Sequence, residues 1–213
     1  RWQKIKKTEM KKILIIKILL LLFSNISFSQ KKQYFFDEKK NIITEKEYNH
    51  FKNENFEFLK LTFVEDTAKI NVIERRKIQG NLKNELHKEI ISYLNSISDK
   101  KTDSTKTIII NYHPGKDNCN STADKSYVND LYIDFKAKIE MKKNITQYFI
   151  YKSKKGTEFY DKKIKWYYDN ERIIENNFFP LHYPCGSYLI IYPNGKYFLY
   201  KGEYYIKKIL EQI

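Results

Sequence analysis

The sequence predicts an α/β protein whose mixed central sheet is covered by helices on both faces. The run Ile108–Ile110 is continuously β-branched, which is typical of a strand that is buried on both sides. An amphipathic helix over Val128–Ile139 and an apolar strand over Gln147–Tyr151 follow it, so the two strands should be parallel with a right-handed crossover. Further on, Asn194-Gly195 between two apolar runs is the strongest hairpin signal in the chain.

The last third of the chain completes this core. Gly156 opens a polar and aromatic segment that we expect to be helical in part. The hairpin strands should cover Ser187–Tyr192 and Tyr197–Lys201. Apolar residues at helical spacing from Ile206 to Ile213 then predict a closing helix. We assign residues 101–213 to the core.

Residues 30–100 are expected to form an α+β extension that packs on the core. Thr44 followed by Glu47 is a capping-box pattern, which predicts the start of a short helix. The other expected elements are strands over Gln33–Phe36, Phe56–Val64 and Ala68–Ile73, a break at Gly80 and a helix over Asn81–Ile97. The second and third of these strands should form a hairpin.

The start of the chain has the pattern of an export signal. The segment Met10–Lys12 is basic, and Ile13–Phe23 is an apolar run that is short for a membrane span. Small residues in Ser27–Ser29 then suit cleavage by a signal peptidase. We expect residues 10–29 to be removed as a signal peptide, and residues 1–9 to be upstream sequence that is not translated. The mature protein would be periplasmic or secreted, with no stable membrane anchor.

The composition excludes several classes of function. The formal net charge is +14, and without residues 1–29 it falls to about +8, spread over lysines on every element. No nucleic-acid motif accompanies this charge, so we expect a protein partner in the cell envelope and no nucleic acid. Six widely spread glycines form no phosphate-binding loop, and no cofactor is expected. His50 and His87 fall on predicted helices without a partner, so we expect both at the surface.

The two cysteines, Cys119 and Cys185, carry most of the chemical information. In an exported chain two cysteines most simply form one disulfide. The loop that follows the β-branched strand contains His113 and ends at Cys119. Cys185 lies between Pro184 and the hairpin strand.

The order strand, helix, strand, helix, hairpin, helix resembles the core of the thioredoxin superfamily over residues 105–213. The segment Ser187–Gly202 resembles the terminal hairpin of that family, including both of its glycines. The resemblance implies a three-layer core in which the two cysteine loops face each other, so it predicts a Cys119–Cys185 disulfide. The chain departs from the family because Cys119 has no cysteine three residues later. Pro184 also lies further from the hairpin than the cis-proline of the family.

Three hypotheses for function follow. In the first, the disulfide is structural and the protein is a non-catalytic binding domain or a degenerate family member. In the second, Cys119 is the nucleophile of a thiol-disulfide or peroxide redox protein, activated by a helix N-terminus and His113, and Cys185 is the resolving cysteine. In the third and weakest, His113, Cys119, His182 and Cys185 bind copper or zinc. We favour the first, so the protein is expected not to be an enzyme.

Overall fold

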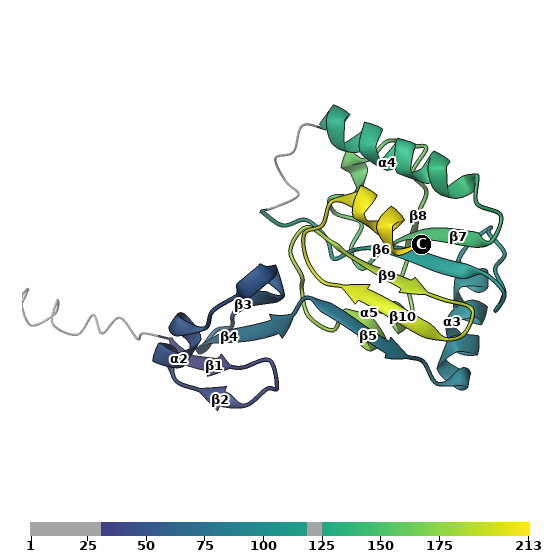
Figure 1. Cartoon of the computed structure of the whole chain (residues 1–213). Helices are drawn as coiled ribbons and strands as arrows, with labels where there is room; N and C mark the ends of the chain where they lie inside the picture. The colour runs from purple at the N-terminus through teal and green to yellow at the C-terminus, as the bar shows by residue number, and fades with distance from the viewer. Residues whose placement is uncertain (1–30, 119–124) are drawn as a thin grey trace, which may run out of the picture.

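The structure is a computed structural model that describes residues 31–118 and 125–213. Within these residues the chain forms two mixed sheets and the helices that flank them (Figure 1). The expected signal peptide at residues 10–29 and Cys119 lie outside the described residues. In the described part of the chain, no helix combines the length and the apolar character that crossing a membrane requires.

The N-terminal residues build the smaller sheet, in which four strands are ordered β2-β1-β4-β3. Its strands are β1 (Lys32–Phe36), β2 (Ile42–Ile43), β3 (Phe58–Val64) and β4 (Ala68–Arg75). Strand β1 is parallel to β4, whereas β1–β2 and β3–β4 are antiparallel pairs. The predicted hairpin is therefore confirmed, with Val64 opposite Lys69 at its turn.

Helix α2 (Glu45–His50) covers one face of the smaller sheet. The predicted capping box is confirmed: Thr44 Oγ1 accepts a hydrogen bond from the Glu47 N–H, and Glu47 Oε2 accepts one from the Thr44 N–H. This start fixes the helix so that Tyr48 packs against Phe35, with ring centroids 5.2 Å apart. A short 3₁₀ turn, η1 (Glu54–Phe56), leads into β3.

The larger sheet has six strands in the order β5-β10-β9-β6-β7-β8. They are β5 (Lys77–Asn81), β6 (Thr107–His113), β7 (Ile145–Tyr151), β8 (Trp166–Tyr168), β9 (Ser187–Ile191) and β10 (Lys196–Tyr200). Strands β6, β7 and β8 run parallel, and β9 is antiparallel to β6. Strand β10 is antiparallel to both β9 and β5. The expected mixed sheet, its parallel pair β6–β7 and its β9–β10 hairpin are confirmed.

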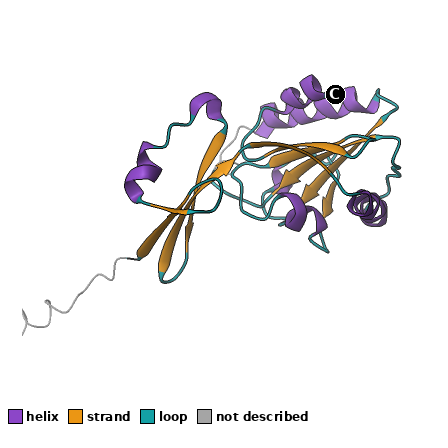
Figure 2. Ribbon diagram, turned by 60° about the horizontal axis from the view of Figure 1, so that its bottom comes forward, coloured by secondary structure: helices purple, strands orange, loops and turns teal. Residues whose placement is uncertain are grey.

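Helices cover both faces of the larger sheet (Figure 2). Helices α3 (Asn84–Ile97) and α5 (Ile173–Phe178) pack on one face, and α4 (Lys125–Glu140) with the 3₁₀ helix η3 (Ile206–Gln212) on the other. Every residue of β6 is buried, as its continuous apolar run predicts. Its side chains alternate between the layers: Ile110 faces α3 and α5, and Ile109 faces α4 and η3.

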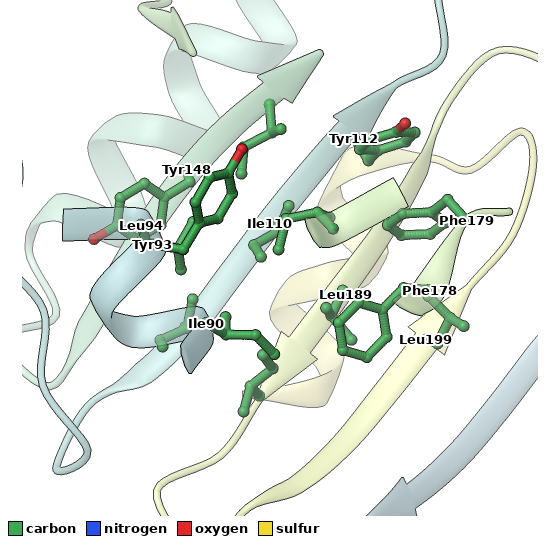
Figure 3. Close-up of a cluster of buried hydrophobic side chains, with 14 of the residues drawn as sticks. Ile90, Tyr93, Leu94, Ile110, Tyr112, Tyr148, Phe178, Phe179, Leu189 and Leu199 are labelled. Atoms are coloured by element: carbon green, nitrogen blue, oxygen red, sulfur yellow. The ribbon is translucent and has the colours of Figure 1, made fainter. Parts of the chain in front are cut away.

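The α3 and α5 face holds the larger of the apolar clusters (Figure 3). Ile90 and Leu94 of α3 reach Ile110 at the centre of the sheet, and all three side chains are fully buried. Beside them the rings of Tyr112 and Phe179 stack with centroids 4.5 Å apart. Burial of this cluster holds β6 in a fixed position, so the loop that follows β6 starts from a rigid base.

One expectation about the elements, the break at Gly80, was wrong. Gly80 does not break the chain but lies inside β5, directly opposite Tyr197 of β10. A Cβ at Gly80 would lie 2.7 Å from the Tyr197 ring, so glycine makes room for that ring within a strand. The expected closing helix is confirmed and is the 3₁₀ helix η3. The segment after Gly156 is helical in part, as expected, through α5, and it also holds Trp166–Tyr168 as a parallel edge strand. Strand β5 and helix α3, from the range expected for the extension, form part of the larger sheet and its covering layer.

A buried ion pair links the two sheets. Lys201, which follows β10, places its Nζ 2.8 Å from Oε2 of Glu74 in β4. Both side chains are only 8% exposed. Lys40, from the turn between β1 and β2, also pairs with Glu74. The chain passes directly from β4 to β5 at Arg76, whose carbonyl accepts a hydrogen bond from the Lys201 N–H. The junction is therefore a packed contact and not a flexible linker.

Candidate functional site at the carboxyl end of β6

Two loops meet where β6 ends. The first runs from Pro114 to Asn118 after β6, and the second runs from Leu181 to Gly186 before β9. Asp117 joins them, because its Oδ2 accepts a hydrogen bond of 2.9 Å from the Cys185 N–H. His182 Nε2 lies 3.2 Å from the same oxygen. The structure therefore brings Asp117, His182 and Cys185 together.

The second loop makes a tight turn over the end of β6. Cys185 and Gly186 both have positive φ angles, +69° and +132°. A Cβ at Gly186 would lie 3.1 Å from the carbonyl oxygen of Tyr112, so glycine allows the backbone to approach β6 closely. Next to it Ser187 is fully buried, and its Oγ accepts a hydrogen bond of 3.1 Å from the Gly202 N–H. These contacts fix the position of the backbone at Cys185.

His113, the last residue of β6, lies beneath these loops and is 1% exposed. Its ring packs near Trp166 and Tyr160, with centroid distances of 5.6 and 6.2 Å. Gly156 lies against Nε2, since a Cβ there would come within 2.8 Å of it. Among the described residues Nε2 has no hydrogen-bond partner.

Burial lowers the pKa of His113, and it outweighs the hydrogen bond to the Lys155 backbone and the negative charge of Asp117, which act in the opposite direction. A buried imidazole without a partner for Nε2 is favoured in its neutral form. His113 is thus poorly suited to supply the positive charge that the redox hypothesis assigned to it.

Two of the predicted site residues, His182 and Cys185, lie together above a third, His113. His182 and Cys185 lie in one loop and share Asp117, while His113 is buried below. Cys119 lies outside the described residues, so the Cys119–Cys185 disulfide, the redox pair and the four-residue metal set stay predictions. Within residues 31–118 and 125–213, no three His, Cys, Asp or Glu side chains group closely enough to hold a metal ion.

The sequence analysis missed two buried polar groups near this end of the sheet. Asp169 is 1% exposed, accepts a hydrogen bond of 2.7 Å from Tyr93 and caps the start of α5 through the Glu175 N–H. Gln147 Nε2 donates to Asn111 Oδ1, and Asn111 Nδ2 donates to Tyr204. A polar residue inside an otherwise apolar strand, as at Asn111, is the signal that could have indicated this second group.

The expectation that His50 and His87 lie at the surface is confirmed for the first and wrong for the second. His50 is exposed, as expected. His87 is buried on α3 and its Nε2 has no hydrogen-bond partner among the described residues. Burial lowers the pKa of His87. It occupies the apolar face of α3 between Leu86 and Ile90, where the helical period turns it inward.

Comparisons with models of protein families, with curated proteins and with solved structures found no match for this chain.

Proposed function

We propose that this protein is an exported, thioredoxin-like binding domain in which a Cys119–Cys185 disulfide is structural. The observation that supports the proposal most is the hydrogen bond from the Cys185 N–H to Asp117. Cys119 is two residues beyond Asp117, and consecutive Cα atoms are about 3.8 Å apart. Chain connectivity therefore allows the Cα separation of about 4.4–6.8 Å that a disulfide between the two cysteines needs.

The order of the elements supports the likeness to thioredoxins. From β6 onward the chain runs β6-α4-β7, continues through α5 and ends with the β9–β10 hairpin and η3. The parallel pair, the antiparallel hairpin and the helices on both faces are those that the resemblance predicts. The departures lie in the loops, where no cis peptide bond occurs among the described residues.

Several features favour binding over catalysis in this proposal. His113 is enclosed by Gly156 and aromatic rings and is 1% exposed. His182 Nε2 already contacts Asp117.

A disulfide that closes a loop of this length would stabilise the fold by about 4 kcal/mol in the chain-entropy model. Such a bond forms in the oxidising compartment to which a signal peptide at residues 10–29 would direct the chain.

The reduction potential of the cysteine pair tests this proposal against its alternative. The protein is equilibrated in glutathione buffers, free thiols are trapped, and non-reduced peptides are analysed by mass spectrometry. We expect a Cys119–Cys185 peptide and a potential below about −300 mV, the range of inert structural disulfides.

Two other results would contradict the structural role. A potential between about −120 and −270 mV would favour the redox protein, with Cys119 as the nucleophile and Cys185 as the resolving cysteine. Two free thiols in protein isolated from the cell envelope would exclude the disulfide itself. A Cys185→Ser variant, which has a single thiol, provides the control for the trapping chemistry.

A further inference from the structure

The outer edge of β5 is open. Strand β5 is the first in the order of the larger sheet and pairs only with β10, and it runs along the lower margin of that sheet in Figure 1. The flanking hydrogen bonds, from the Lys201 N–H to Arg76 and from the Leu82 N–H to Gly195, fix which residues face β10. In this ladder the N–H and C=O groups of the even-numbered β5 residues point toward β10. The N–H and C=O groups of residues 77, 79 and 81 therefore point away from β10, to the outside of the sheet.

These outward groups form a pairing template. The side chains of Lys77, Gln79 and Asn81 are exposed, and no backbone hydrogen bond to their N–H or C=O groups occurs among the described residues. The outer edge of β3 differs, because Asn53 occupies both backbone groups of Phe58 through its side chain. In the part of the chain that the structure describes, no side chain occupies the outward backbone groups of β5 in this way.

A trough lies beside this edge, on the face that carries η3. Three hollows of about 380, 330 and 320 Å³ adjoin one another along β5, and Phe198 lines all of them. Lys77 and Gln79 each line two. Alternate side chains of a strand added to β5 would point to this face, because side chains alternate along a strand.

The charge around the trough is positive. Lys77 lies at one end of β5, and Lys196 lies opposite Asn81 at the other end. Neither lysine pairs with a carboxylate among the described residues, whereas Arg75 and Lys208 do so with Glu57 and Glu211. An added strand with acidic side chains would complement the two unpaired lysines.

We propose that the edge of β5 binds an extended, acidic segment of a partner protein as a seventh strand, with alternate side chains in the trough beside Phe198. Backbone pairing would supply the affinity, and the lysines would select for acidic residues. A second copy of this chain is a poorer occupant, because it would bring its own Lys77 and Lys196 to the same edge. The inference rests on the binding role proposed above, but not on the state of the cysteines.

The test uses a fluorescent peptide in which glutamate and valine alternate, with binding to the purified protein measured by fluorescence anisotropy. We expect binding that weakens with salt, and loss of at least about tenfold in affinity for the same peptide with lysine in place of glutamate. Protection of the amides of residues 77, 79 and 81 from hydrogen exchange would locate the bound strand.

Two variants separate the backbone and charge contributions. Gln79→Pro removes an outward N–H without breaking the ladder to β10, and it should abolish binding. Lys77→Glu combined with Lys196→Glu should weaken binding at least about tenfold without disturbing the backbone. Lys163→Glu, in the loop before the opposite edge strand β8, is the matched control and should bind as the parent does.

Several outcomes would overturn the proposal. They are no binding at about 1 mM peptide, binding unchanged in both β5 variants, or protection confined to other strands. Dimerisation through β5, detected by sedimentation and abolished by Gln79→Pro, would replace the acidic peptide by a second copy. The thiol measurements above are independent, so a redox-active cysteine pair with an intact peptide site would refute the structural disulfide alone.

Discussion

His113 is a titratable side chain enclosed at the end of a central strand. Burial lowers its pKa, and the titratable groups around it are Asp117, Glu158 and His182. The unfolded chain therefore binds a proton near pH 6.5 that the folded protein binds only at lower pH. It follows that the neutral imidazole contributes stability above about pH 6.5, and that this contribution is lost as the pH falls.

Replacement of the His113 imidazole should weaken the pH dependence of stability. The free energy of unfolding should fall between pH 7.5 and 5.5, and His113→Gln should reduce that fall by about 1 kcal/mol, because one differential proton is removed. Urea titrations at both values measure it. His50→Gln, at an exposed position, should leave the fall unchanged. An equal fall in the free energy of unfolding of the parent and of His113→Gln would contradict the prediction. It would show that His113 has the same pKa in the folded and unfolded states.

At the scale of an element, β5 shows how one contact decides a sequence position. Glycine normally weakens a strand, yet Gly80 is required because the Tyr197 ring lies across it. Tyr197 in turn packs edge-on against Phe178 of α5, with ring centroids 5.8 Å apart. The glycine therefore serves the packing of a neighbouring strand and helix.

Gly80→Ala should destabilise the protein by about 1–3 kcal/mol, because the added methyl group overlaps the Tyr197 ring. The same substitution in a Tyr197→Ala background should cost much less, since the ring is gone. Chemical denaturation of the four proteins in this double-mutant cycle gives the coupling free energy. Additive effects of the two substitutions would contradict the assigned contact.

For the whole molecule, the ion pair Glu74–Lys201 couples the unfolding of one sheet to the unfolding of the other. Its partners come from different sheets, and neither is exposed enough for water to replace the other. A buried ion pair adds little over apolar residues, but the loss of one partner leaves an unpaired buried charge. The junction should therefore make unfolding of the two sheets cooperative.

Glu74→Gln should lower the free energy of unfolding by about 3–5 kcal/mol, because Lys201 loses its counter-charge. The double substitution Glu74→Leu with Lys201→Met should cost less than Glu74→Gln alone. Glu65→Gln, at an exposed position after β3, is the control and should change stability by less than about 0.5 kcal/mol. Equal stabilities of Glu74→Gln and the control would mean that the junction is hydrated.

The elements whose signals are local could be predicted from the sequence. The β-branched run of β6, the capping box at Thr44, the helical spacing in α3 and α4 and the Asn194-Gly195 turn each depend on neighbours within a few residues. The combination of parallel and antiparallel strand pairs follows from the order of strands and helices along the chain. All of these were predicted correctly because local propensity and burial agree.

The features that join distant segments depend on the tertiary structure. It opposed Gly80 to Tyr197, enclosed His113 and His87, brought Asp117 to Cys185 and buried Glu74 against Lys201. It also left the edge of β5 open beside a trough. None of these follows from periodicity, because each depends on which residues, far apart in sequence, share a face or an edge once the sheets have formed.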